Sequence, residues 1–197
     1  MPDLTYTTLE ASAIQSVRDE LAALRMIVFR SFPYLYDGDE AYERTYLETY
    51  IRSDRSLLFA VMDKGRMVGA TTALPLADET ADVQAPFHQA GYDLNQLFYF
   101  GESVLLPEYR GLGLGNRFFD EREAHARRFG TYSTACFCAV QRPLDHPLRP
   151  DDYRPLDAFW VKRGYTARPE LQTTFVWPDR GETESTEKAM MYWTRPL

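Results

Sequence analysis

The chain has 197 residues, of which 45% are hydrophobic and 14% aromatic, a composition that supports a sizeable folded core and excludes an intrinsically disordered protein. Its net charge of −7 argues against general binding to nucleic acids or anionic membranes. No apolar run is long enough for a transmembrane helix, and the N-terminus lacks the basic and apolar regions of a signal peptide, so we expect a cytoplasmic protein.

The first half of the chain carries strand and helix signals in turn. Leu4–Leu9 alternates as a strand does, and apolar residues then recur every three or four positions from Ile14 to Val28, which predicts an amphipathic helix. Ser12 and Gln15 are spaced as a capping box for its start. Three further elements are expected, a helix over Asp39–Ile51 and the two strands of a hairpin, Leu57–Met62 and Met67–Leu74.

The second half begins with a polar stretch, residues 77–95, that has room for one short helix. The elements expected after it are a strand over Leu97–Leu106, a helix over 113–129, a strand over Tyr132–Val140, a proline-rich loop over 143–155, a helix over Leu156–Arg163, and strands over Leu171–Trp177 and Ala189–Thr194. Strands mixed with helices and hairpins predict an α/β protein with a mixed sheet covered by helices, and we expect one domain over residues 1–197.

Three alternating glycines lie where the strand Leu97–Leu106 gives way to a helix: Gly111, Gly113 and Gly115. The first N–H groups of a helix have no internal partner and the helix dipole favours an anion there, so the junction predicts a pyrophosphate site, with Arg110 as an added cation. A dinucleotide-binding G-x-G-x-x-G does not fit, because Phe118 occupies the third glycine position. A Walker A loop does not fit either, because Asn116 follows Gly115.

The spacing that does fit is R-x-x-G-x-G, carried by Arg110, Gly113 and Gly115. It resembles the acetyl-coenzyme A loop of the GNAT superfamily of N-acetyltransferases. A second stretch, Phe159–Tyr165, resembles the other signature of that family, an aromatic pair near a helix end followed by glycine and an aromatic residue. An ordinary glycine-rich turn is the alternative explanation of the first motif.

The resemblance implies a GNAT-like acyl-coenzyme A N-acyltransferase fold with a mixed, mostly antiparallel central sheet flanked by helices. It also implies transfer of an acetyl group from acetyl-coenzyme A to a primary amine by direct attack on the thioester, with no metal. The residues expected to bind the cofactor are those of the strand end and the loop: Val104, Leu105, Leu106, Arg110, Gly111, Leu112, Gly113, Leu114, Gly115 and Asn116.

Two residues are candidates for catalysis. The family uses a backbone N–H near a bulge of the central strand to stabilise the oxyanion, which points to Leu105. Glu102 is the only carboxylate of that strand and the candidate general base, although it could instead face solvent or pair with a structural arginine. Tyr99 is an alternative contact to the acceptor. The family's acid tyrosine is replaced here by Trp160, which leaves Tyr153 or Tyr165, or an unassisted thiolate.

The acceptor site is expected near the first two helices, where Tyr42, Tyr46 and Tyr50 recur every four residues beside several carboxylates. Aromatic rings with carboxylates suit a cationic amine, but such stripes are more often core, and a tyrosine-rich packing face with a solvated acidic edge is the explanation that this general rule favours. The loop 143–155 could also line the site.

Two classes of function remain open from the sequence. One is an N-acetyltransferase acting on a small-molecule or peptide amine, without nucleic acid or membrane partners and with a homodimer left open. The other is a non-catalytic domain that binds or senses acyl-coenzyme A, which the missing motif tyrosine favours.

Overall fold

The computed structural model describes residues 3–197 and contains one seven-stranded sheet in the order β1-β2-β3-β4-β5-β7-β6. The strands are β1 (Leu4–Glu10), β2 (Leu57–Asp63), β3 (Arg66–Pro75), β4 (Leu97–Leu105), β5 (Thr134–Val140), β6 (Thr166–Trp177) and β7 (Thr186–Pro196). All neighbours are antiparallel except β4 and β5, which run parallel. The mixed, mostly antiparallel sheet expected from the sequence is therefore confirmed.

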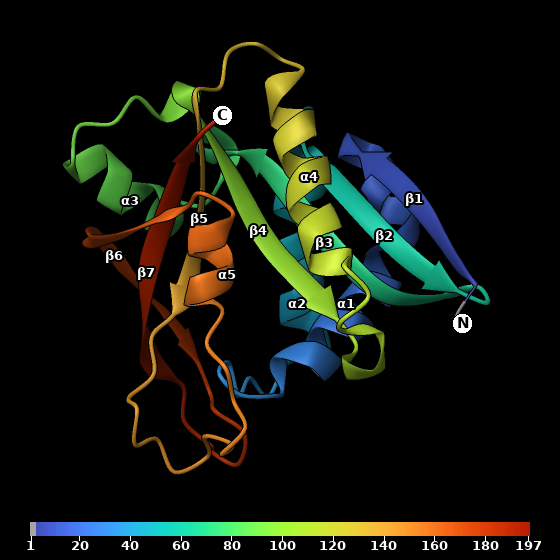
Figure 1. Cartoon of the computed structure of the whole chain (residues 1–197), viewed down its shortest axis with the longest axis vertical. Coiled ribbons are helices and arrows are strands. Elements are labelled where there is room, and N and C mark those ends of the chain that lie inside the picture. Colours follow the sequence, from blue (N-terminus) through green and yellow to red (C-terminus); the bar gives the residue numbers. More distant parts are fainter. Residues whose placement is uncertain (1–2) are drawn as a thin grey trace.

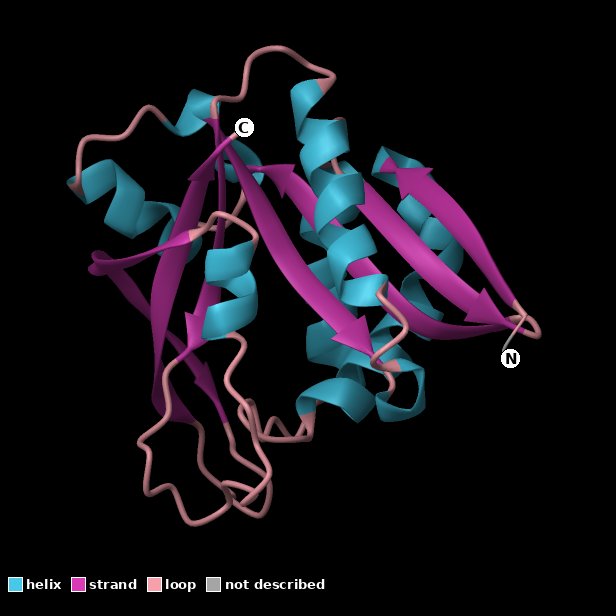
Figure 2. Ribbon diagram, in the orientation of Figure 1, coloured by secondary structure: helices cyan, strands magenta, loops and turns pink. Residues whose placement is uncertain are grey.

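Helices cover both faces of this sheet (Figures 1 and 2). The α-helices are α1 (Arg18–Phe29), α2 (Glu40–Arg52), α3 (Ala81–Gln89), α4 (Leu114–Arg127) and α5 (Asp157–Lys162). In Figure 1, α4 and α5 lie in front of the sheet, and α1 and α2 lie behind it. Short 3-10 helices complete the fold: η1 (Ala11–Val17), η2 (Leu76–Asp78), η3 (Leu94–Gln96) and η4 (Pro107–Tyr109).

Strand β7 extends at both ends beyond the expected Ala189–Thr194, and two larger differences from the sequence prediction occur elsewhere. The segment before α1 is the 3-10 helix η1. Its N-cap residue is Glu10, whose side chain makes no capping hydrogen bond, so the predicted capping box at Ser12 and Gln15 does not start this helix. Strand β6 begins at Thr166 rather than Leu171. Its pairing with β7 shifts between Arg168 and Gln172. Because this irregularity interrupts the alternation of apolar and polar residues, the alternation did not predict the first residues of the strand.

Strands β4 and β5 form the feature that positions the site. They pair only over Leu97–Tyr99 and Thr134–Cys136, at the start of both strands. Figure 1 shows the two strands diverging beyond that point, so the second half of β4 borders β3 on one side only. A backbone edge is therefore left unpaired in the middle of the sheet.

Candidate active site

The unpaired edge of β4 exposes the backbone groups of Leu105. Leu106 donates its N–H to the carbonyl oxygen of Val68 in β3 at 3.0 Å. Because successive residues of a strand direct their N–H and C=O groups to opposite sides, those of Leu105 point away from β3, toward the side that β5 has left. Val104, Leu105 and Leu106 were all predicted to offer backbone groups to the cofactor. The pairing with β3 leaves only Leu105 of these three with its N–H and C=O directed toward the open edge.

The register of β4 also contains the bulge that the sequence argument invoked. Ala73 pairs with Phe100 and Thr71 with Ser103, so β4 has one residue more than β3 across this interval. The extra residue lies at Gly101 and Glu102, before Leu105 along the strand. Bulges re-aim side chains, and this one directs the Glu102 side chain into the interior beside α1 and α2.

Beyond β4 the chain forms the glycine-rich loop at the start of α4. Gly111 and Gly113 have φ values of 79° and 81°, which side chains with a Cβ rarely adopt. Gly113 is the N-cap of α4 and supplies no side chain to the helix end, so the first amides face outward. This is the geometry that the predicted pyrophosphate site requires, with Gly111 to Gly115 as the expected donors.

The structure changes the roles that were expected for some residues of the loop. The N–H of Asn116 bonds to the carbonyl oxygen of Gly113 at 3.1 Å, so its backbone amide is not available to a phosphate as predicted. Arg110 is exposed and, within residues 3–197, makes no ion pair with Glu108, which was the structural alternative for it. Leu112 is exposed and Leu114 is buried, so the latter anchors the loop in the core.

Helix α4 is fixed to α5 and β7 through one buried carboxylate, Glu123. Its Oε1 accepts hydrogen bonds from Arg195 at 2.8 Å, Arg163 at 3.1 Å and the hydroxyl of Tyr165 at 3.2 Å. On the same side, the ring of Phe159 lies 3.7 Å from the position of a Cβ on Gly115. The second sequence signature therefore packs beside the glycine-rich loop.

On the opposite face, Glu102 is buried among charged groups rather than apolar ones. Its Oε2 accepts hydrogen bonds from Arg25 Nη1 at 2.5 Å and from the hydroxyl of Tyr46 at 2.9 Å, while Arg25 Nε donates to Glu43 at 2.5 Å. The arginine pair left open by the sequence is thus present, and it stabilises the ionised carboxylate. Oε1 of Glu102 is buried and has no hydrogen-bond partner in the described chain.

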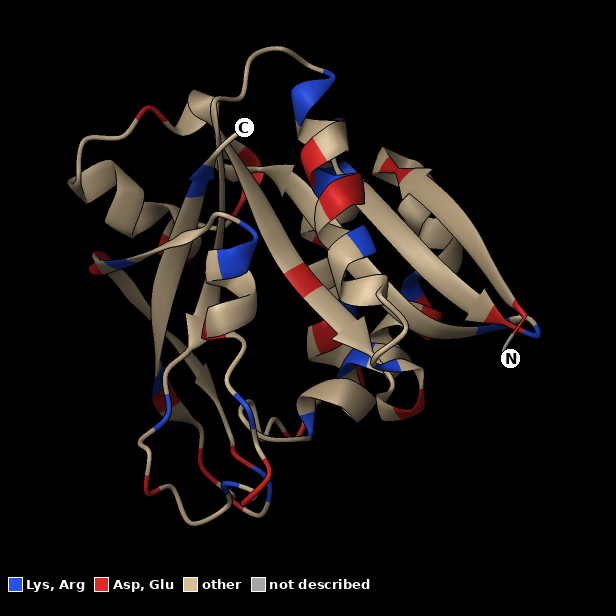
Figure 3. Cartoon of the chain, viewed as in Figure 1, with Lys and Arg blue, Asp and Glu red and all other residues tan. Residues whose placement is uncertain are grey.

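Figure 3 shows an acidic segment in the middle of β4, and Glu102 is the only acidic residue of that strand. Sequence reasoning missed Arg25 and Glu43 as its neighbours. A signal existed for Arg25, because it falls within the apolar stripe of Leu21, Leu24 and Val28 and a charge there must be buried or paired.

The tyrosines of α2 divide by exposure. Tyr42 is 57% exposed, Tyr46 is half-buried and Tyr50 is fully buried. Glu43 is fully buried as well, so the carboxylates beside these rings are not all on a solvated edge. Tyr46 and Tyr50 contribute hydroxyl groups to the interior next to Glu102, with 2.9 Å between their oxygen atoms.

The aromatic residues considered for proton transfer to the thiolate lie in different surroundings. Tyr165 is buried, and its hydroxyl donates a hydrogen bond to Glu123. Trp160 is half-buried and packs against Phe137 and Trp193, each with 5.1 Å between ring centroids. Tyr99 contacts Cys138 through its hydroxyl at 3.2 Å.

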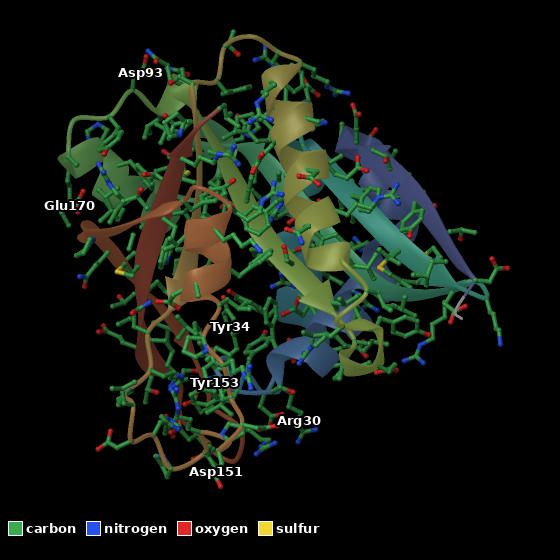
Figure 4. All side chains as sticks on the ribbon, in the orientation of Figure 1. Arg30, Tyr34, Asp93, Asp151, Tyr153 and Glu170 are labelled. Atoms are coloured by element: carbon green, nitrogen blue, oxygen red, sulfur yellow. The ribbon has the colours of Figure 1, made fainter. Side chains whose placement is uncertain are left out.

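Tyr153, from the loop 143–155, packs edge-on against Phe32 at 4.6 Å between ring centroids. Figure 4 shows Tyr153 and Tyr34 in the same region, at the end of the sheet from which the long loops extend. Arg142 holds the segment 30–36 there, because it donates to the carbonyl of Tyr34 at 2.7 Å and forms a two-pronged pair with Asp179, with both distances 2.7 Å. Burial alone would raise the pKa of Asp179, but the hydrogen bonds and charge of Arg142 and Lys188 bring that pKa below its usual value.

The described residues contain no helix long and apolar enough to cross a membrane. No curated protein matches the sequence. Many solved structures share the fold, among them three acetyltransferases at 11–14% identity. One is a putative acetyltransferase from Acinetobacter baylyi, with a TM-score of 0.63, 11% identity, and 100% of this chain and 94% of that chain covered.

The second is yncA of Salmonella typhimurium, a putative acetyltransferase solved with its cofactor acetyl-CoA, with a TM-score of 0.60, 11% identity, and 98% and 94% of the two chains covered. The third is a polyamine N-acetyltransferase of Drosophila melanogaster, with a TM-score of 0.60, 14% identity, and 99% and 100% covered. These likenesses establish the fold. The family model described as the acetyltransferase (GNAT) family matches residues 21–150, most of the chain from α1 through β5, and the protein therefore belongs to the GNAT family of acetyltransferases.

Proposed function

We propose that this protein transfers an acetyl group from acetyl-coenzyme A to a primary amine of a small molecule or peptide, by direct attack of the amine on the thioester. The observation that carries the proposal is that β4 and the loop after it supply three features together. These are the buried carboxylate of Glu102, the unpaired backbone edge at Leu105, and the outward-facing amides of Gly111–Gly115. Acetyl-coenzyme A supplies the acetyl group as a thioester that a neutral amine attacks without a covalent enzyme intermediate.

The roles of the residues follow from their positions. The amides of Gly111–Gly115 and the guanidinium of Arg110 bind the pyrophosphate. The carbonyl oxygen of Leu105 pairs with the pantetheine arm, and its N–H donates to the thioester oxygen as negative charge develops there. Glu102 attracts the acceptor ammonium through its free Oε1 and takes its proton.

The acceptor is proposed to be cationic before it reacts. Oε1 of Glu102 has no hydrogen-bond partner within the described residues, whereas Arg25 pairs with Oε2 and Arg122 lies at the backbone carbonyl of Glu102, so an ammonium at Oε1 would supply a missing donor. This supports a small-molecule or peptide amine and disfavours an anionic partner such as a nucleic acid.

The test is release of free thiol from acetyl-coenzyme A in the presence of a panel of primary amines, with product mass recorded. Saturable, amine-dependent release with an acetylated product supports the proposal. Trp160 favours a second candidate, an acyl-coenzyme A sensor, because an indole at this position cannot act as an acid. Binding of acetyl-coenzyme A by calorimetry without thiol release for any amine would favour the sensor.

A further inference from the structure

A buried series of hydrogen bonds connects Glu102 with a second carboxylate, Glu79, which follows β3 and η2. Tyr46 Oη lies 2.9 Å from Glu102 Oε2 and 2.9 Å from Tyr50 Oη, and Tyr50 Oη lies 3.3 Å from Glu79 Oε1. Tyr50, Glu79 and Glu102 are at most 7% exposed. Four side chains from α2, β4 and the segment after β3 thus form one continuous path.

This path needs one proton more than its two tyrosine hydroxyl groups provide. Three hydrogen bonds between two carboxylates and two hydroxyls need three protons, and Tyr46 and Tyr50 supply only two. The third must reside on a carboxyl group. Glu102 is paired with the Arg25 guanidinium, whereas Glu79 makes no ion pair within residues 3–197 and accepts only the N–H of Thr80 at its other oxygen, at 2.9 Å. The shared proton therefore resides on Glu79 when all three bonds are formed.

The surroundings of Glu79 agree with this assignment. Burial raises the pKa of Glu79 to about 7, against the hydrogen bonds that Thr80 and Tyr50 donate to its ionised form, which lower it. The charged and titratable groups that face it come from α1, α2, β4, β5 and β7, and they are Arg25, Tyr42, Tyr46, Tyr50, Tyr99, Glu102, Cys136, Cys138 and Tyr192. Arg25 is the only cation among them, and it contacts Glu102 directly.

The chain just before Glu79 borders a surface hollow. Ala77 and Asp78 line this hollow of about 1110 Å³, together with Ser53, whose hydroxyl donates to Asp78 at 2.5 Å. The hollow is formed where β3 ends and β5 begins, at the end of the sheet opposite the glycine-rich loop. Glu79 thus follows directly on a solvated segment and is itself 7% exposed, at a distance from the cofactor loop.

We infer that Glu79, Tyr50 and Tyr46 form a proton relay that carries the acceptor's proton away from Glu102, an inference that rests on the proposed function. Glu79 first releases the shared proton to water, and the hydroxyl groups of Tyr50 and Tyr46 then turn to donate toward Glu79. The ammonium gives one proton to the carboxylate of Glu102, its nitrogen forms the bond to the acetyl carbon as the carbon–sulfur bond breaks, and the second proton of the nitrogen goes to the departing thiolate. Glu102 passes its proton to Tyr46 as Tyr46 passes its own to Tyr50 and Tyr50 passes its own to Glu79, which restores the path with one shared proton.

The relay makes a spectroscopic prediction that needs no turnover. In the protein with ¹³C-labelled tyrosine, the Cζ signal of Tyr46 should shift with the titration of Glu79 near pH 7, because the shared proton redistributes along the path. The shift should be lost in Tyr50→Phe and in Glu79→Gln and retained in Tyr42→Phe, the exposed tyrosine of the same helix. A Tyr46 signal that ignores the Glu79 titration in the unmodified protein would overturn the inference.

Kinetics supply the second test. Tyr50→Phe and Glu79→Gln should lower kcat about 10- to 100-fold, within the range of acid–base contributions, with KM for acetyl-coenzyme A unchanged, and Glu79→Gln should abolish the limb of the pH profile near pH 7. Unchanged kcat and pH profile in both variants would overturn the relay while the proposed acetyl transfer stands. Absence of turnover in the unmodified protein, with the Tyr46 titration intact, would overturn the proposed function and leave the shared-proton path in place.

Discussion

The hydroxyl group of Tyr50 lies directly against the backbone of Gly101. A Cβ at position 101 would stand 1.8 Å from Tyr50 Oη and 2.8 Å from its Cζ, so only glycine allows α2 to approach β4 this closely. A glycine inside a strand lowers stability because its backbone loses more entropy on folding. At position 101 it permits the close approach of α2 that brings Tyr50 within hydrogen-bonding distance of Tyr46 and Glu79.

Gly101→Ala should therefore destabilise the protein by about 1–3 kcal/mol, the usual cost of overpacking a buried site. Urea unfolding of Gly101→Ala, Tyr50→Phe and the double variant measures the coupling between the two positions. Loss of the hydroxyl should recover part of the cost of the added methyl group, whereas simple additivity of the two changes would contradict the contact.

Arg25→Met should cost about 3–5 kcal/mol of unfolding free energy, because it leaves the buried carboxylates of Glu43 and Glu102 without their cation. Arg44→Met is the matched control, since Arg44 is an exposed partner of Asp19 on the same helical pair and should cost less than about 1 kcal/mol. Equal losses in the two variants, measured by urea unfolding, would show that the buried position has no special weight.

Glu79 should make stability depend on pH in an unusual direction. Burial raises the pKa of Glu79 from its ordinary value of 4.5 to about 7, so its contribution is fully present below pH 4.5 and declines as pH rises toward and through 7. Relative to the unmodified protein, Glu79→Gln should gain on the order of 3 kcal/mol between pH 4 and pH 8. Urea unfolding at both pH values tests this, and parallel behaviour of the two proteins would refute the shift.

Gly113→Glu should abolish binding of acetyl-coenzyme A, because the side chain places a carboxylate at the pyrophosphate position. Gly91→Glu is the matched control, since Gly91 has a similar φ of 77° and equally open surroundings but lies before η3, away from the loop. Calorimetry should show lost binding in the first variant and retained binding in the second. Retained affinity in Gly113→Glu would remove the loop from the cofactor site.

Trp160→Phe should retain most of the activity and stability, because the indole acts through packing on Phe137 and Trp193. Trp160→Ala should cost about 2–3 kcal/mol, less than a fully buried tryptophan, since this one is half-buried. A large fall in kcat for Trp160→Phe with folding and cofactor affinity unchanged would mean that the indole N–H takes part in the reaction.

The elements that could be predicted from the sequence were those with a strong apolar repeat or with clear turn and helix-end residues at their bounds. The β2–β3 hairpin and the helix that opens at Gly113 were predictable because tight turns and helix ends depend on local residues. The 3-10 helix η1 after β1 and the start of β6 were not, since η1 has a shorter repeat than an α-helix and a register shift breaks the alternation of β6.

The glycine-rich loop was predictable for a related reason, as its glycines and Arg110 lie within six consecutive residues. The environment of Glu102 was not, because Arg25, Glu43 and Glu79 reach it from three different elements. Which charges meet in the interior depends on how α1 and α2 pack on the sheet, and a single sequence does not encode that in any local pattern.

The three-way bonding of Glu123 has a consequence for how a ligand would be received. One buried carboxylate ties α4 to α5 through Arg163 and to β7 through Arg195, so the helix end and the aromatic residue beside it hold their relative positions without a ligand. Little of the protein then has to become ordered on association, and the entropic cost falls mainly on the flexible ligand. Association should accordingly be a single fast step whose observed rate rises in proportion to ligand concentration, with no slow rearrangement after the encounter.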